Sequence, residues 1–132
     1  IAQDPDNVKL LINYATMVES KDLDKAINSY KKVLNKEPNN FIANFNLGGV
    51  YINKSKKMDD EIREIPTSEQ AKLDAKMEEQ KVVLKNAFKY MKKASDAKPD
   101  NLQAARASWQ IAARLELPEE PELKKRYDAA NN

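Results

Sequence analysis

Apolar and small side chains recur three or four positions apart through most of the chain, which places them on one face of an α-helix. In residues 22–37 this pattern consists of Ala26, Tyr30 and Val33, and Pro38 follows. The same spacing recurs once, at Ala87, Met91, Ala94 and Pro99. We find no strand candidate, because the chain has only two glycines and lacks β-branched runs. The pattern therefore predicts an all-α chain.

Three short motifs of related sequence divide this helical pattern. They are Pro5–Asn7, Pro38–Asn40 and Pro99–Asn101, which lie 33 and then 61 residues apart. A helical stretch follows each motif, and in the second motif Asn39 or Asn40 is suited to cap the helix N-terminus. A period near 33 residues is typical of a repeat protein, and the second interval exceeds one period by about 27 residues. No glycine-rich filler occupies this surplus, so we expect a helical insertion.

The surplus residues have the pattern of two helices that share a seam. Heptad spacing runs over residues 51–65 and again over residues 73–94. An antiparallel turn at Pro66 brings four pairs into one register: Ile62 with Leu73, Met58 with Met77, Ser55 with Gln80, and Tyr51 with Leu84. The turn ends in a predicted capping box, in which Thr67 caps the second helix and Gln70 reaches back. The hairpin should project roughly 20 Å beyond an ordinary repeat.

The end of the chain predicts one longer helix, at about residues 101–115, and a short final helix that opens at Pro118 and Pro121. Trp109 stands where the preceding unit has a glycine, so the next helix cannot pack as in the earlier pairs. We favour Trp109 as a plug at the end of the core, and a place on a binding surface is the alternative. The final helix is interpreted as the polar cap that solenoids need.

Together these elements predict one all-α domain over residues 1–132. Its architecture is an antiparallel helix-hairpin array, an α-solenoid of about six helices, with the third and fourth lengthened into a projecting hairpin. We call the helix that opens each repeat a first-type helix. The expected parts are a first repeat (4–38), a second repeat (39–99) with a helical insertion around 52–80, a third first-type helix (100–116) and a capping helix (118–130).

Composition narrows the range of functions. The 132 residues are 41% apolar and 33% charged, and they include no histidine or cysteine. This excludes the zinc sites, thiol chemistry and histidine-dependent triads that need these residues. No glycine-rich phosphate loop is present, and the carboxylates of residues 59–61 lie in a strongly charged helix without an evident pocket. We therefore expect no enzyme activity, no cofactor and no metal.

The charge pattern points to no particular anionic partner, because the formal net charge is only +2. Lysines gather at Lys85, Lys89, Lys92 and Lys93. No arginine-rich or aromatic-interleaved patch accompanies them, so we interpret them as a solvated helix face and expect no nucleic acid. No window approaches 18 uninterrupted apolar residues, and we expect no membrane span. The start at Ile1 in place of a methionine suggests a trimmed product.

The segment Asn46–Tyr51, which has the form Asn-Leu-Gly-x-x-Tyr, resembles the first helix of a tetratricopeptide repeat. The two small-aromatic-proline spacings described above resemble its second helix. With the stretches Ile65–Ala75 and Gln110–Leu115, the chain is similar to a group of such proteins from Gram-negative bacteria, which are often exported and have no assigned activity. This resemblance implies a periplasmic or cell-envelope location, and the cytoplasm is the alternative.

In that family the first-type helices line a concave groove that holds peptides. The register implies this role for seven residues: Lys9, Ile12, Asn13, Ile42, Phe45, Asn46 and Arg106. Lys9, Asn13 and Asn46 match part of a carboxylate clamp for a peptide C-terminus, although we favour solvated polar residues. Phe45 is a candidate apolar platform, although packing against the neighbouring first-type helix is favoured.

The resemblance thus implies a non-catalytic scaffold that binds a protein or peptide on the concave face of the first-type helices. The alternative is a structural or self-associating module in which the projecting hairpin makes the contacts. Charged runs on its outer faces, as in residues 56–57 and 59–61, favour solvent exposure over an apolar dimer seam. We therefore expect a monomer.

Overall fold

The computed structural model describes residues 7–132, and this part of the chain contains no β-strand. Pro5 and Asp6 of the first motif lie outside the described residues. The helices are α1 (Val8–Val18), α2 (Leu23–Lys36), α3 (Phe41–Glu64), α4 (Gln70–Ala97), α5 (Leu102–Arg114) and α6 (Glu120–Ala130).

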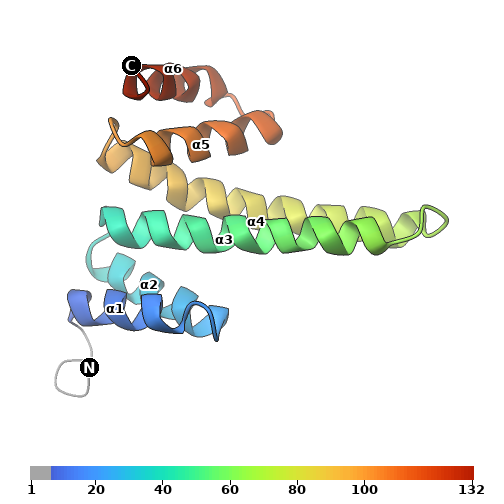
Figure 1. Cartoon of the computed structure of the whole chain (residues 1–132), viewed down its shortest axis with the longest axis horizontal. Helices are drawn as coiled ribbons and strands as arrows, with labels where there is room; N and C mark the ends of the chain where they lie inside the picture. The colour runs from blue at the N-terminus through green and yellow to red at the C-terminus, as the bar shows by residue number, and fades with distance from the viewer. Residues whose placement is uncertain (1–6) are drawn as a thin grey trace.

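The helices stack in chain order, and each one contacts the next (Figure 1). α3 and α4 have 24 and 28 residues, whereas the other helices have 11 to 14. The two long helices form a hairpin whose turn projects far beyond the ends of the others (Figure 1). The predicted fold class is confirmed: the chain is an all-α array of antiparallel helix hairpins with an elongated third and fourth helix.

The last asparagine of each motif caps a helix. The Oδ1 atoms of Asn7, Asn40 and Asn101 accept hydrogen bonds from the backbone N–H three residues later, at 3.1, 2.9 and 2.9 Å. The second cap is thus Asn40 and not Asn39. Buried Asn44 supports this turn, because its Nδ2 donates to the carbonyl oxygens of Pro38 and Asn40. The recurring motif is therefore a helix-start signal in each case.

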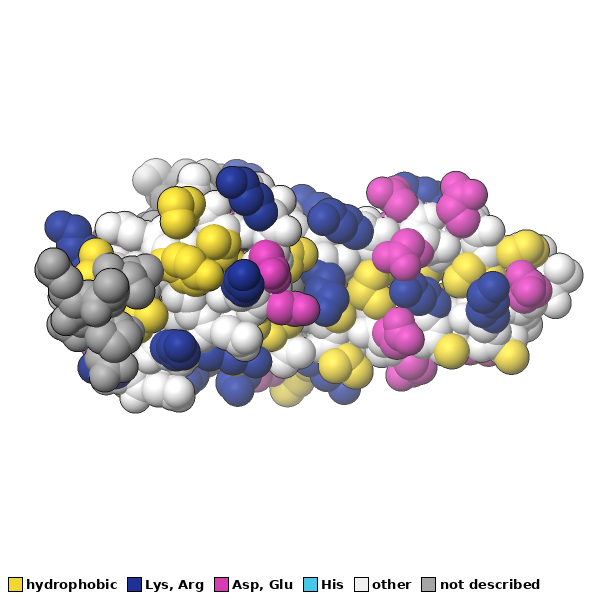
Figure 2. All heavy atoms as spheres, turned by 90° about the horizontal axis from the view of Figure 1, so that it is seen from below, with side chains coloured by type: hydrophobic (Ala, Val, Ile, Leu, Met, Phe, Trp, Pro, Cys, Tyr) yellow, Lys and Arg dark blue, Asp and Glu magenta, His cyan; other side chains and the backbone are white. Residues whose placement is uncertain are grey.

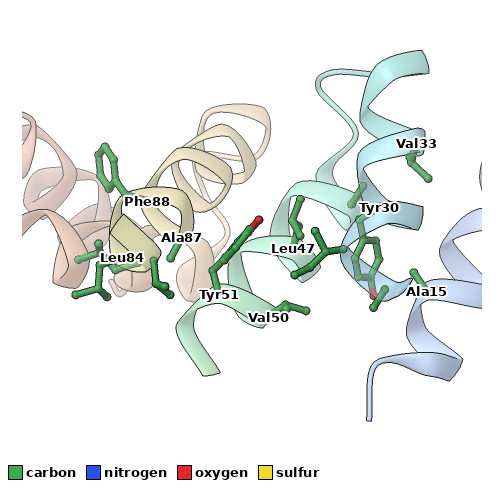
Figure 3. Close-up of a cluster of buried hydrophobic side chains, with 14 of the residues drawn as sticks. Ala15, Tyr30, Val33, Leu47, Val50, Tyr51, Leu84, Ala87 and Phe88 are labelled. Carbon is green, nitrogen blue, oxygen red and sulfur yellow. The ribbon is translucent and has the colours of Figure 1, made fainter. Parts of the chain in front are cut away.

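The small and aromatic positions that predicted the second helices lie in the core. Ala26, Tyr30 and Val33 of α2 are completely buried. α3 connects this part of the core to the next, because Leu47 points toward α2 while Tyr51 lies between α3 and α4 (Figure 3). The core is therefore continuous along the stack.

Gly48 determines how closely α3 and α4 approach each other. A Cβ atom at this buried position would lie 3.0 Å from the Cε atom and 3.1 Å from the backbone nitrogen of Met91. The backbone contact cannot be relieved by a side-chain rotation. At the neighbouring Gly49, by contrast, a Cβ atom would have no neighbour within 4 Å, and the φ angle is not positive. Packing thus requires glycine at position 48 only.

Gln80 joins the two long helices near the middle of the hairpin. Its buried Nε2 donates to the carbonyl oxygen of Ser55 at 3.0 Å and to Oδ1 of Asp59 at 2.5 Å. Tyr51 and Leu84, another predicted pair, are both buried. The Ser55–Gln80 contact is one that the antiparallel register predicted.

The seam becomes shallower toward the turn. Met58 is buried, but its predicted partner Met77 is 45% exposed. Ile62 and Leu73 are only half-buried. The sequence did not indicate this loss of burial, which has a simple cause: the outer hairpin has only two helices, and two helices cannot enclose a seam on all sides.

The predicted capping box at the turn is wrong. α4 begins at Gln70, its N-cap residue is Glu69, and no side chain caps the helix. The Gln70 side chain donates forward to Asp74 at 2.8 Å. A backbone hydrogen bond from Glu69 N–H to the Pro66 carbonyl closes the turn, so Thr67 lies inside the turn and too early to cap α4.

α6 covers the end of the stack through Trp109. The indole ring stacks on Tyr127 with the ring centroids 5.1 Å apart, and its Nε1 donates to Oε1 of Glu120 at 2.9 Å. Leu123 of α6 is buried in the core cluster against which Trp109 packs. This geometry favours the interpretation of Trp109 as a plug between α5 and α6.

The contrast between the two glycines predicts opposite effects of the same substitution. Both Gly48→Ala and Gly49→Ala replace glycine by a residue whose helix propensity is about 1 kcal/mol more favourable. Only Gly48→Ala introduces a clash with Met91. We expect Gly49→Ala to stabilise the protein. The free energy of unfolding of this variant should exceed that of Gly48→Ala by about 1–3 kcal/mol. Urea unfolding of the two variants measures this difference, and equal stabilities would contradict the close approach.

Candidate functional site

The seven sequence-predicted residues lie on the three first-type helices α1, α3 and α5. Their exposure differs. Lys9, Asn13 and Arg106 are exposed, Ile12, Phe45 and Asn46 are half-buried, and Ile42 is 50% exposed. The structure thus leaves polar groups on each helix, and Ile42 of α3 is the most exposed apolar residue among the seven.

Phe45 is part of a small apolar cluster that joins α3 to α4 and α5. Its ring stacks on Phe41 with centroids 5.5 Å apart, and both rings pack against the cluster formed by Met91, Ala94 and Ala104. This arrangement agrees with the favoured packing role of Phe45 rather than with a free platform.

An open cleft of about 730 Å³ separates the C-terminal end of α1 and the start of α2 from α3. Its lining residues are Thr16, Glu19, Ser20, Lys21, Leu23, Val50, Asn53 and Lys57. The buried hydroxyl of Tyr30 donates to Glu19 Oε2 at 2.9 Å and lies 3.3 Å from the Thr16 hydroxyl. Burial raises the pKa of the Tyr30 phenol, and the Glu19 carboxylate acts in the same direction. Tyr30 therefore stays neutral and holds one wall of the cleft in place.

A second cleft, of about 340 Å³, lies between α3 and α5. Its lining residues are Ile52, Ser55, Lys56, Leu84, Ala107, Gln110, Ile111 and Arg114. Arg114 also reaches Oδ1 of Asp59 at 3.4 Å, the same oxygen that accepts from Gln80. This ion pair connects the middle of the hairpin to α5 beside the second cleft.

Basic groups outnumber acidic ones along the two clefts. Lys21 and Lys57 line the first cleft, and Lys56 and Arg114 line the second. The only carboxylate among the lining residues is Glu19, which accepts the Tyr30 hydrogen bond. The arrangement therefore suits a ligand with acidic groups.

The structure does not bring the proposed clamp residues into either cleft. Lys9, Asn13 and Asn46 are absent from both linings. The clefts lie one to two turns further along the same helices. Asn53 and Lys57, which line the first cleft, were not among the predicted site residues. The signal was present, because these residues continue the three-and-four spacing of the first-type helix beyond Tyr51.

The described residues show neither a metal site nor a membrane-spanning helix. Within residues 7–132 no group of three or more carboxylates is arranged to hold a metal ion. No helix in this range is both long and apolar enough to cross a membrane.

A stack of antiparallel helix pairs with clefts between its first-type helices defines a helical-repeat scaffold. A family model described as TPR repeat matches residues 17–55, which run from the end of α1 through α2 into α3. This match and the all-helical fold support a tetratricopeptide-repeat protein, and such repeats generally mediate protein–protein interactions. A search of curated proteins finds no match to the chain.

The contact between Gln80 and Asp59 predicts a measurable pKa change. The hydrogen bond from Gln80 lowers the pKa of the Asp59 carboxyl, and Arg114 acts in the same direction. Because this pKa is lower in the folded state, the resulting stability is present above about pH 4 and is lost as the pH falls through the folded pKa.

Gln80→Leu should therefore move the pKa of Asp59 back toward its ordinary value, and a carboxyl-detected NMR titration measures this shift. Gln70→Leu is the matched control, since Gln70 bonds to Asp74 instead. An unchanged Asp59 pKa in Gln80→Leu would show that the hydrogen bond does not hold the carboxylate.

Proposed function

We propose that this chain is a protein-binding scaffold that holds an acidic segment of a partner against the face formed by α1, α3 and α5. The two clefts between these helices carry the proposal, because they lie side by side along α3 and are both edged by basic groups. A continuous face of this kind suits an extended or helical peptide segment.

Orientation of the ligand would come from amide and basic donors. Asn53 and Lys57 lie four residues apart on α3 and line the first cleft. Lys56, one residue earlier, lines the second cleft. One turn of α3 therefore presents donors to both clefts, and a partner carboxylate placed across this helix can accept from either side. Arg106 of α5 is exposed and adds positive charge on this face.

Affinity would come from apolar contacts beside these donors. Ile42 is 50% exposed at the start of α3, and Ile52 lines the second cleft. Between them Gly49 leaves open space above the helix backbone. A partner side chain can enter this space and bury apolar surface, which is worth about 25 cal/mol per Å².

We also propose that the scaffold is non-catalytic, as tetratricopeptide-repeat proteins typically are. The division into repeats at 4–38 and 39–99, with a first-type helix at 100–116 and a cap at 118–130, belongs to the same proposal. So does a location in the periplasm or cell envelope, which rests on the resemblance of the sequence alone.

Peptide selection against the purified protein tests the binding face. Peptides chosen from a random displayed library should be rich in Asp and Glu. A selected peptide should bind Lys57→Glu about tenfold more weakly than the wild type, because an attraction becomes a repulsion. Isothermal titration calorimetry measures both affinities, and Asn46→Ala reports whether the clamp residue contributes.

Lys31→Glu is the matched control, because Lys31 is an exposed lysine of α2 that lines neither cleft. It should leave affinity almost unchanged. Selection of peptides without acidic enrichment, or equal losses in Lys57→Glu and Lys31→Glu, would rule out the proposed face.

A further inference from the structure

The outer side of α4 carries a regular row of exposed residues. Its members are Ala71, Ala75, Glu78, Val82, Lys85 and Lys89, and all six are exposed. Their spacing alternates between four and three, which places them along one stripe of the helix. The opposite side of α4, with buried Gln80 and Leu84, packs against α3. We call the exposed stripe the α4 outer row.

Charge reverses along the long hairpin. Residues 59–79 contain eight carboxylates and three basic side chains, a net charge of −5. Residues 80–98 contain six lysines and one aspartate, a net charge of +5. On the face drawn in Figure 2, acidic side chains accordingly gather over the projecting end of the molecule. These net charges already count both members of ion pairs such as Lys76–Glu61, at 2.8 Å. The difference in charge between the two halves of the hairpin therefore remains.

Val82 lies at the point where the charge changes sign. It is 59% exposed, with Glu78 and Glu79 on its distal side and Lys85 and Lys89 on its proximal side. An antiparallel copy of α4 centred on Val82 places Val82 against Val82 and Ala75 against Lys89. It sets Lys85 level with Glu79 and one residue from Glu78. The α4 outer row is therefore complementary to itself, which is the requirement for a two-fold symmetric contact.

We propose that the protein pairs with a second copy of itself through the α4 outer row, antiparallel and with the two-fold axis at Val82. Each acidic hairpin end then lies along the basic half of the partner's α4, whereas a parallel arrangement sets like charges together. The pairing accounts for Lys85 and Lys89 of the lysine group, whereas Lys92 already pairs with Asp96 at 2.9 Å. It uses the side of α4 that faces away from α3, so it is independent of peptide binding in the clefts.

The proposed dimer is an alternative to the monomer that we expect from the charged faces of the hairpin. That expectation rests on the absence of an apolar dimer seam. A seam of one valine, small alanines and opposite charges relies on electrostatics instead, so association should weaken strongly as salt screens the charges.

Sedimentation velocity tests the proposal on the full chain. We expect the wild type to dimerise at about 20 mM ionic strength and to dissociate at about 500 mM, where the screening length falls below about 5 Å. The charge-reversed variants E78K/E79K and K85E/K89E should each raise the dissociation constant about tenfold or more. K31E/K32E on α2 changes the same charge as K85E/K89E and should dimerise like the wild type.

A mixture of the two charge-reversed variants gives the decisive result. In that heterodimer every acidic position again meets a basic one, so the 1:1 mixture should associate about as tightly as the wild type, and E78K/E79K/K85E/K89E should dimerise alone. Circular dichroism checks that these exposed substitutions leave the fold intact. A wild type that stays monomeric at low salt overturns the proposal, as does a mixture that fails to associate or a dimer insensitive to both variants and to Val82→Asp.

Discussion

The close approach of α3 and α4 at Gly48 is the constraint on which the rest of the structure depends. Because no side chain stands between this glycine and the Met91 backbone, the two helices meet near the base of the hairpin and stay in contact beyond it. Gln80 then fixes their register by its bonds to Ser55 and Asp59. A wider separation at Gly48 would break both the core contact between α3 and α4 and the hydrogen bonds of Gln80.

α3 therefore has three roles along its length. Its first turns, around Leu47, complete the core with α2 (Figure 3). Its middle, from Ile52 to Lys57, forms walls of both clefts. Its last turns leave the body and form one arm of the hairpin (Figure 1). The face proposed to bind a partner and the hairpin proposed to pair two copies are thus mechanically connected, although they use opposite sides of the α3–α4 layer.

Sequence periodicity predicted the parts of this fold that depend on local spacing. The helix starts at Asn40 and Asn101, the buried residues of α2 and the Ser55–Gln80 contact all follow from residue types at fixed separations. The predictions were wrong where the chain could adopt a different local arrangement from the one that the residue pattern indicates. A backbone turn ending at Glu69 replaced the capping box at Thr67, and Met77 stayed exposed because no further helix reaches it.

The sequence by itself determined that the chain is helical, where its helices begin and which stripe of each is apolar, because these properties depend on neighbours within a few residues. Only the tertiary structure decided where the clefts lie and which charges face a common surface. A cleft exists only between helices whose separation is set elsewhere in the fold, as Gly48 sets that of α3 and α4. The charge reversal along α4 was visible in the sequence, but its significance depended on knowing that the α4 outer row is left uncovered by the rest of the described chain.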